Sequence, residues 1–277
     1  MSDAIQKEKE QFQHFRESME ELLQKPKNEF TYRDFDFFAA YSFRNACYEY
    51  WFNHDKDKFL TLMYSVPSNI LASYGEGELH EDNNQEIRGD CRRFSLPSAY
   101  CNIYYALCGK NFSGAKELAQ LYLDTGLFEK EFSYTEQYCY GYCMMYLLTN
   151  DQRFWTILKK LRRKKAKNKP RSFGQILEAI TEHLETKAQE GLNDLVKTMN
   201  LSWEDPHTGF INTWALALAN LCRLHGLMVH ETKQRVPPSL IPKELVTPQV
   251  PEELLVTPEE VKAVLEKDPA LGQLPPQ

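Results

Sequence analysis

One segment near the end of the chain, residues 209–245, constrains the fold more than any other. One helical face is formed by residues at spacings of 3, 4, 7 and 11, namely Ile211, Trp214, Ala215, Leu218 and Cys222. Leucines and alanines fill most of the remaining circumference, and a helix that is apolar all round is buried within a domain. His225 falls in the last turn, Gly226 allows a left-handed exit, and the following prolines exclude a further helix until Pro242. The segment therefore predicts the last core helix of an all-α domain.

Helical signals also fill most of the chain before this segment. Ser133 with Glu136 forms a capping box, and Pro97 suits the first position of a helix. Pro67 lies inside another helical pattern, which should kink or split there. No period-2 alternation is longer than Leu227–Val229, so strands should be scarce. We predict helices over about 4–24, 32–52, 58–74, 97–108, 113–123, 133–148, 151–165 and, as one helix or two, 172–199.

The domain organisation follows from where the helical signals stop. They run almost unbroken to His225, which predicts a single multi-helix domain of packed helical hairpins over residues 1–234. Residues 235–277 hold nine of the fourteen prolines and are predicted to form a proline-rich extension. Within it, Thr257 and Glu260 form a capping box that should open a short helix.

Composition and cysteine usage predict the compartment. The longest stretch without a charged residue, 59–75, is too short and too polar for a membrane-spanning helix, and the N-terminus lacks the apolar core of a signal peptide. The seven cysteines include no Cys-x-x-Cys pair, which is typical of thiols in a reducing compartment. We therefore expect a cytoplasmic protein without a membrane partner.

The sequence also lacks the motifs of common enzyme classes. It contains no Gly-x-Ser-x-Gly, no phosphate-binding Gly-x-x-x-x-Gly-Lys, no His-Glu-x-x-His and no dinucleotide-binding Gly-x-Gly-x-x-Gly. Cys139 and Cys143 lie one helical turn apart and could share a metal ion, but two thiols without a nearby histidine pair make a poor site. Apolar packing is the favoured interpretation of this pair. We predict no enzymatic activity, no cofactor and no metal.

Charge is distributed unevenly along the chain, whose net charge is −6. Residues 159–171 hold nine basic side chains and no acidic one, so the remainder carries 24 basic against 39 acidic groups, a net −15. The basic run could bind RNA or an acidic protein surface, or it could be a solvated helix end whose lysines complement the helix dipole. Nucleic acid is disfavoured as the main ligand, because the chain is acidic and the run contains no aromatic residue for base stacking.

An acidic segment is the predicted partner-binding site. Its acidic residues, set against a single Arg88, are Glu76, Glu78, Glu81, Asp82, Glu86 and Asp90. They could form a recognition patch for a basic nuclease-like partner, an ordinary exposed loop, or a calcium site, although their spacing does not match the helix-loop-helix calcium pattern. Tyr100 and Tyr104 follow closely and are the predicted aromatic anchors, with core packing as the alternative.

Two parts of the chain resemble the immunity protein 49 family of bacterial polymorphic-toxin systems. That family has a small-residue helix of the type Ala-Leu-Ala…Leu…Leu-His-Gly, here beginning at Ala215, which leads into a Pro-x-Leu-Ile-Pro-x-x-Leu segment, here 238–245. The likeness covers roughly residues 32–245 and is strongest over 138–155 and 213–245. Its motifs are patterns of small and apolar residues that other helical immunity families share.

The resemblance implies a non-enzymatic, all-α cytosolic protein that binds and neutralises a cognate secreted toxin. A nuclease or a nucleic-acid deaminase is the kind of toxin implied, and no catalytic residue is carried over. Two further function classes remain open. A helical-repeat adaptor would present its surface to a housekeeping protein, and an RNA-associated regulator would use residues 159–171. The sequence does not give the oligomeric state.

Overall fold

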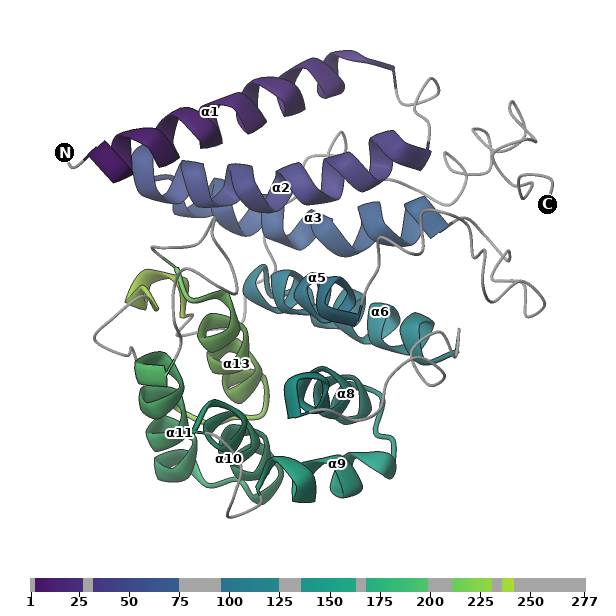
Figure 1. Cartoon of the computed structure of the whole chain (residues 1–277), viewed down its shortest axis with the longest axis vertical. Coiled ribbons are helices and arrows are strands. Elements are labelled where there is room, and N and C mark those ends of the chain that lie inside the picture. The colour runs from purple at the N-terminus through teal and green to yellow at the C-terminus, as the bar shows by residue number, and fades with distance from the viewer. Residues whose placement is uncertain are drawn as a thin grey trace. The chain divides into compact units, whose positions relative to one another are not determined.

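The structure, a computed structural model (Figure 1), describes residues 3–26, 32–74, 96–124, 136–162, 168–198, 211–230 and 236–241. These residues form ten α-helices and one short 3₁₀ helix, and no strand occurs among them. The predicted all-α fold class is confirmed. None of the described helices combines the length and the apolar character needed to cross a bilayer.

Contacts divide the chain into two compact units, which we describe separately. Unit 1 comprises residues 1–95 and 248–277, and unit 2 comprises residues 96–247. The prediction of one domain over residues 1–234 stays a prediction.

The described part of unit 1 consists of three helices. They are α1 (Asp3–Gln24), α2 (Tyr32–Phe52) and α3 (Lys56–Tyr74). Helix α2 packs against both of the others, and the three helices lie side by side (Figure 1). The buried apolar side chains of unit 1 include Met19, Phe43, Ala46, Cys47, Phe59, Leu62, Met63, Val66 and Ile70.

Pro67 does not split α3, which continues from Lys56 to Tyr74. A proline ring removes the backbone donor for the carbonyl oxygen four residues earlier, here that of Met63. Two side-chain hydrogen bonds lie in the neighbouring turns of the helix. The Ser65 hydroxyl donates to the Leu62 carbonyl oxygen at 2.8 Å, and the Asn69 side-chain amide donates to the Ser65 carbonyl oxygen at 3.0 Å. Both side chains are buried. Of the predicted kink or split, the split therefore does not occur.

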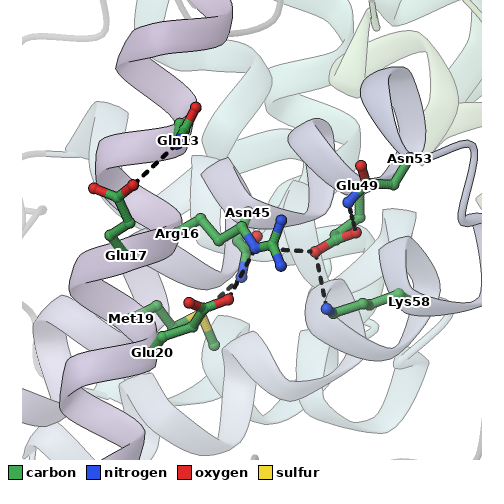
Figure 2. A network of polar contacts seen from close by, with 9 residues as sticks. All are labelled: Gln13, Arg16, Glu17, Met19, Glu20, Asn45, Glu49, Asn53 and Lys58. Carbon is green, nitrogen blue, oxygen red and sulfur yellow. Dashed lines mark hydrogen bonds and ion pairs between the residues drawn. The ribbon is translucent and has the colours of Figure 1, made fainter.

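A buried carboxylate joins the three helices of unit 1 (Figure 2). The side chain of Glu49 on α2 is 3% exposed, and its Oε1 lies 2.8 Å from Nζ of Lys58 on α3 and 3.8 Å from Nε of Arg16 on α1. The Asn53 amide donates to the other carboxylate oxygen. A buried charge is tolerated only when it is paired and hydrogen-bonded, and Glu49 meets both conditions.

The described part of unit 2 is built from helices that pack in sequential pairs. Its elements are α5 (Leu96–Cys108), α6 (Phe112–Asp124), α8 (Glu136–Leu148), α9 (Arg153–Leu161), α10 (Asn168–Glu182), α11 (Glu185–Thr198), α13 (Thr213–Leu224) and the 3₁₀ helix η2 (Pro238–Leu240). Helices α5 and α6, α8 and α9, and α10 and α11 contact each other, as the predicted helical hairpins require. The region 172–199, for which we predicted one helix or two, contains two helices, α10 and α11.

Helix α13 is the predicted core helix of unit 2. Asn212 caps its start, its Oδ1 accepting from the backbone N–H of Ala215 at 2.9 Å, and all ten residues from Thr213 to Cys222 are buried. Trp214 packs against the rings of Tyr104 on α5 and Phe173 on α10, with centroid separations of 5.2 Å and 6.3 Å. The helix therefore connects elements that are distant in the sequence.

Asn220, the polar side chain in the middle of α13, connects this helix to α5. Asn220 is fully buried, and its Nδ2 donates to the carbonyl oxygens of Leu107 at 2.9 Å and Cys108 at 3.3 Å. These are carbonyl groups of the last turn of α5, which have no donor within their own helix. Asn220 thereby ties the end of α5 to the core helix.

The first residues of the predicted extension pack into unit 2. Val236, Leu240 and Ile241 are buried, and residues up to 247 belong to this unit. These residues belong to the extension predicted from residue 235 onward. Residues 242–277 lie outside the described part, and so does the short helix predicted from Thr257.

Candidate protein-binding surface

Three large apolar side chains are exposed where two helix ends of unit 2 meet. Leu184 lies between α10 and α11, Leu224 ends α13, and Met228 follows it. Their exposed fractions are 45%, 40% and 49%. The structure exposes only two other large hydrophobic residues in its described part, Leu23 and Trp155. We call Leu184, Leu224 and Met228 the apolar cluster.

The tight connection between α10 and α11 fixes Leu184. His183 adopts a left-handed conformation with φ of 55°, which ends α10, and the Leu184 N–H donates to the Ala179 carbonyl oxygen at 2.9 Å. The Leu184 carbonyl oxygen in turn accepts from the Ala188 N–H at 3.0 Å, in the first turn of α11. Backbone hydrogen bonds therefore hold Leu184 on both sides, and its side chain points away from the core.

A glycine-terminated helix end fixes Leu224. Gly226 has φ of +79°, a conformation that glycine adopts without steric cost. The Leu227 N–H donates to the Cys222 carbonyl oxygen at 2.9 Å, and the Gly226 N–H donates to that of Arg223 at 3.0 Å. This pair of bonds is the Schellman arrangement, which closes the helix and reverses the chain.

Residues 227–230 then run beside the start of α11. Leu227 and Val229 are buried while Met228 and His230 are exposed, so this short alternation has one inner and one outer side. The Met228 N–H donates to Glu185 Oε2 at 2.9 Å, and the His230 N–H donates to Gln189 Oε1 at 2.7 Å. Because Glu185 and Gln189 are one turn apart on α11, they hold the backbone of residues 228–230 along the first turns of this helix, which Leu184 directly precedes.

Two histidines border the apolar cluster. Partial loss of hydration lowers the pKa of His225, and the charge of neighbouring His183 lowers it further. The His225 ring is therefore mainly uncharged at neutral pH. The acidic Glu185 is engaged by the Met228 backbone, and the Arg223 guanidinium contacts the Met228 sulfur. The apolar cluster therefore has a carboxylate and a guanidinium in direct contact with Met228.

This arrangement suits the binding of another protein. Apolar side chains held by fixed backbone form the centres of protein interfaces, where a partner removes them from water. Clustered exposed leucine and methionine side chains are also uncommon on a surface that contacts only water. In the residues that the structure describes, no group of three or more metal-ligating side chains is placed to hold a metal ion.

Among the residues predicted from the sequence to form the binding site, the structure describes the side chain of Tyr104 alone. Glu76, Glu78, Glu81, Asp82, Glu86 and Asp90 lie outside the described residues, so the acidic segment stays a prediction. Tyr100 lies in α5, but its side chain is also outside the description. Tyr104 is 0% exposed, and its ring packs against Trp214 and Phe173. It belongs to the core, as the alternative interpretation expected, and we do not retain it as a partner-binding residue.

The apolar cluster is not among the predicted site residues, although the sequence holds one signal for it. Leu184 interrupts a polar stretch between two helical patterns, where a leucine has no helix face to join. Leu224 and Met228 on either side of Gly226 gave no comparable signal. Cys139 and Cys143 are both buried, in agreement with apolar packing of the two thiols.

The chain defined so far is an all-α protein with an exposed apolar cluster on the helix ends of its second unit. Comparison of the sequence and the fold with protein-family models, with characterised proteins and with solved structures finds no match.

Proposed function

We propose that this chain is a non-enzymatic immunity-type protein, which binds and neutralises a cognate bacterial toxin through the apolar cluster. A nuclease or a nucleic-acid deaminase is the proposed toxin. One observation carries the proposal. Leu224 and Met228 belong to the same segment, 213–245, whose sequence resembles the immunity protein 49 family.

The energetics of the cluster fit this role. Each of its three side chains exposes between 40% and 49% of its surface. Complete burial of such a side chain contributes roughly 1.5–3 kcal/mol, so a partner that covers the remaining half gains about 1 kcal/mol per residue. A gain of this size is large enough to slow the dissociation of a complex. The acidic balance of the chain outside 159–171 would speed its encounter with a basic toxin.

The first test identifies the partner. The tagged full-length protein is recovered from its native host, and proteins that co-elute in about equal amounts are identified by mass spectrometry. A toxin domain encoded beside the gene supports the proposal once the purified pair binds and the chain protects cells that express the toxin. An abundant housekeeping partner would instead favour the helical-repeat adaptor, for which the sequential pairing of helices in unit 2 is the supporting observation.

The second test maps the surface with that toxin. Leu184→Ser and Met228→Ser should each weaken toxin binding by about fivefold, because each removes about 1 kcal/mol of apolar burial. Leu23→Ser on α1 is the matched control, since Leu23 is 37% exposed and lies outside unit 2. Charge reversal at Glu78, Glu81 and Asp82 tests the acidic segment in the same assay. Unchanged affinity in both cluster variants would move the proposed binding surface elsewhere.

A further inference from the structure

Met228 differs from every other methionine that the structure describes. Its side chain is 49% exposed, whereas those of the remaining described methionines are at most 1% exposed. The buried set consists of Met19, Met63, Met144 and Met145. Hydroperoxides oxidise an accessible thioether to a sulfoxide, which is polar and chiral. Met228 is therefore the described methionine at which such a reagent can act while the protein stays folded.

The sulfur of Met228 is also held in place by its neighbours. The chain reverses at Gly226, after the end of α13, and this reversal brings Met228 back beside the last turn of that helix. There the Arg223 guanidinium donates from Nη1 to the Met228 sulfur. The Met228 backbone is held as well, since its N–H donates to Glu185 Oε2 at 2.9 Å. Both the main chain and the sulfur of this residue thus have defined partners.

The Arg223 guanidinium has further donors available beside this sulfur. Within the part of the chain that the structure describes, Arg223 forms no ion pair, and its side chain donates only to Met228. A guanidinium carries several N–H donors, and a thioether sulfur is a weak acceptor for them. The oxygen of a sulfoxide is a stronger acceptor, and a hydrogen bond from a charged donor is stronger again. Oxidation of Met228 therefore improves its interaction with Arg223.

The contact with Arg223 distinguishes the two sides of the sulfur. A thioether sulfur has two lone pairs, and attack through one or the other gives sulfoxides of opposite configuration. Because an Arg223 N–H is directed at the sulfur, it engages one lone pair and leaves the other for the oxidant. A methionine that rotates in water has no such preference. The geometry thus predicts one dominant sulfoxide configuration at Met228.

We propose that Met228 is a site of reversible oxidation by a hydroperoxide, with Arg223 as the positioning residue that selects one configuration of the sulfoxide. The sulfur attacks the terminal oxygen of the peroxide, the O–O bond breaks, and the proton of the terminal oxygen passes to the departing oxygen. Sulfur is oxidised, and the peroxide is reduced to water or an alcohol. A thiol-dependent reductase reverses the change, since two thiols form a disulfide while the sulfoxide oxygen leaves as water.

Oxidation of Met228 controls the apolar cluster, a consequence that rests on the proposed function. The sulfoxide oxygen lies in the same cluster as Leu184 and Leu224, and a toxin that covers the cluster would have to remove water from it. A bound toxin, in turn, shields the sulfur from the peroxide. Oxidation therefore acts on the unbound chain and weakens toxin binding until the sulfoxide is reduced.

The first test needs only the full chain. The protein is treated with hydrogen peroxide, and the sulfoxide at each methionine is quantified by peptide mass spectrometry. Two stereospecific reductases, each acting on one configuration, then report the configuration at Met228. We expect Met228 to react at least about tenfold faster than the buried methionines, with one configuration exceeding the other by about threefold or more. Protein oxidised in urea is the reference, and its ratio should be about one.

Variants separate a positioned sulfur from one that is merely exposed. Arg223→Leu should bring the configuration ratio of the folded protein close to that in urea. Lys197→Leu removes an exposed cation from the end of α11 and should leave the ratio unchanged. Far-UV circular dichroism verifies that each variant remains helical. Equal amounts of both configurations in the folded unaltered protein overturn the proposal, and so does a ratio that survives in Arg223→Leu. Oxidation of Met228 no faster than that of the buried methionines also overturns it.

The second test uses the purified toxin domain and addresses the control of binding. Peroxide treatment should weaken toxin binding by about fivefold or more, the loss expected from Met228→Ser. Met228→Leu keeps an apolar side chain that peroxide does not oxidise, so its affinity should be equal before and after treatment. Unchanged affinity of the treated unaltered protein overturns the control of binding. Absence of toxin binding before treatment overturns the proposed function together with this control, while the configuration ratio still decides the oxidation site.

Discussion

Replacing Lys58 with methionine should destabilise unit 1 more than neutralising its buried partner Glu49. Lys58→Met removes the cation 2.8 Å from Glu49 Oε1 and leaves the carboxylate, which is 3% exposed, with Arg16 at 3.8 Å and the Asn53 amide. Removing one partner of a buried pair typically costs about 3–5 kcal/mol. Because Arg16 and Asn53 remain, we expect about 2 kcal/mol.

Glu49→Gln leaves two cations without their carboxylate, and we expect it to destabilise the protein less than Lys58→Met does. It leaves two cations whose side chains are 44% and 34% exposed, so both Lys58 and Arg16 can regain water. The glutamine keeps the shape of the side chain and can still accept from Asn53. We expect a loss of about 1 kcal/mol, the typical value of a hydrogen bond. The double variant Lys58→Met with Glu49→Leu should recover most of the stability, because it leaves neither charge buried.

Urea unfolding followed by far-UV circular dichroism measures these differences as shifts in the transition midpoint. Lys56→Met is the matched control, since Lys56 is an exposed lysine two residues away in the first turn of α3. It should shift the midpoint very little. If Glu49→Gln destabilises the protein as much as Lys58→Met does, then burial of the carboxylate is not what makes Lys58 important, and the reasoning is refuted.

Three further predictions concern unit 2. Asn220→Leu should lower the free energy of unfolding by about 1–2 kcal/mol, because the buried Cys108 carbonyl oxygen loses its Asn220 donor, whereas that of Leu107 keeps the Lys110 N–H; a urea midpoint equal to that of the unaltered protein would contradict this. Gly191→Ala places a Cβ 2.7 Å from Ile176 Cγ1 and should cost about 2 kcal/mol in overpacking, which outweighs the roughly 1 kcal/mol gained in helix propensity. A higher melting temperature for this variant would show that α10 and α11 separate easily. The lowered pKa of His225 means that the unfolded chain binds a proton more readily than the folded one. The contribution of His225 to the free energy of unfolding is therefore complete above about pH 6.5, and it is lost as pH falls through the lower pKa of the folded state. His225→Gln should reduce the loss of stability on acidification, measured by unfolding at several pH values, and an unchanged pH profile would argue against it.

The helices could be predicted because their signals are local. Capping boxes, prolines and apolar periodicity placed α2 at its observed bounds, and they placed the last core helix after Gly209, where α13 lies. Pro67 predicted a kink or a split, and α3 is not split. A proline predicts a lost backbone donor, but it does not predict whether the surrounding packing keeps the helix in one piece.

The candidate binding surface could not be predicted in the same way, because it depends on contacts between distant segments. The Met228 backbone is bonded to Glu185, the residue after Leu184, although the two residues are 43 positions apart in the sequence. Tyr104 shows the converse problem. A helix rich in tyrosine does not reveal which ring faces Trp214, and so its sequence pattern left both the interface and the core open for Tyr104.

Buried cysteines in each of the two units can serve as chemical probes of local opening. Cys47 is buried in unit 1, whereas Cys108, Cys139, Cys143 and Cys222 are buried in unit 2. Burial raises the pKa of Cys222 to about 12, so its reactive thiolate is scarce while the helix stays packed. Alkylation must therefore wait until the surrounding helices separate, and its rate measures the free energy of that separation. Peptide mass spectrometry of a partly alkylated sample would thus compare how tightly the two units are held closed, from one tube and without any substitution.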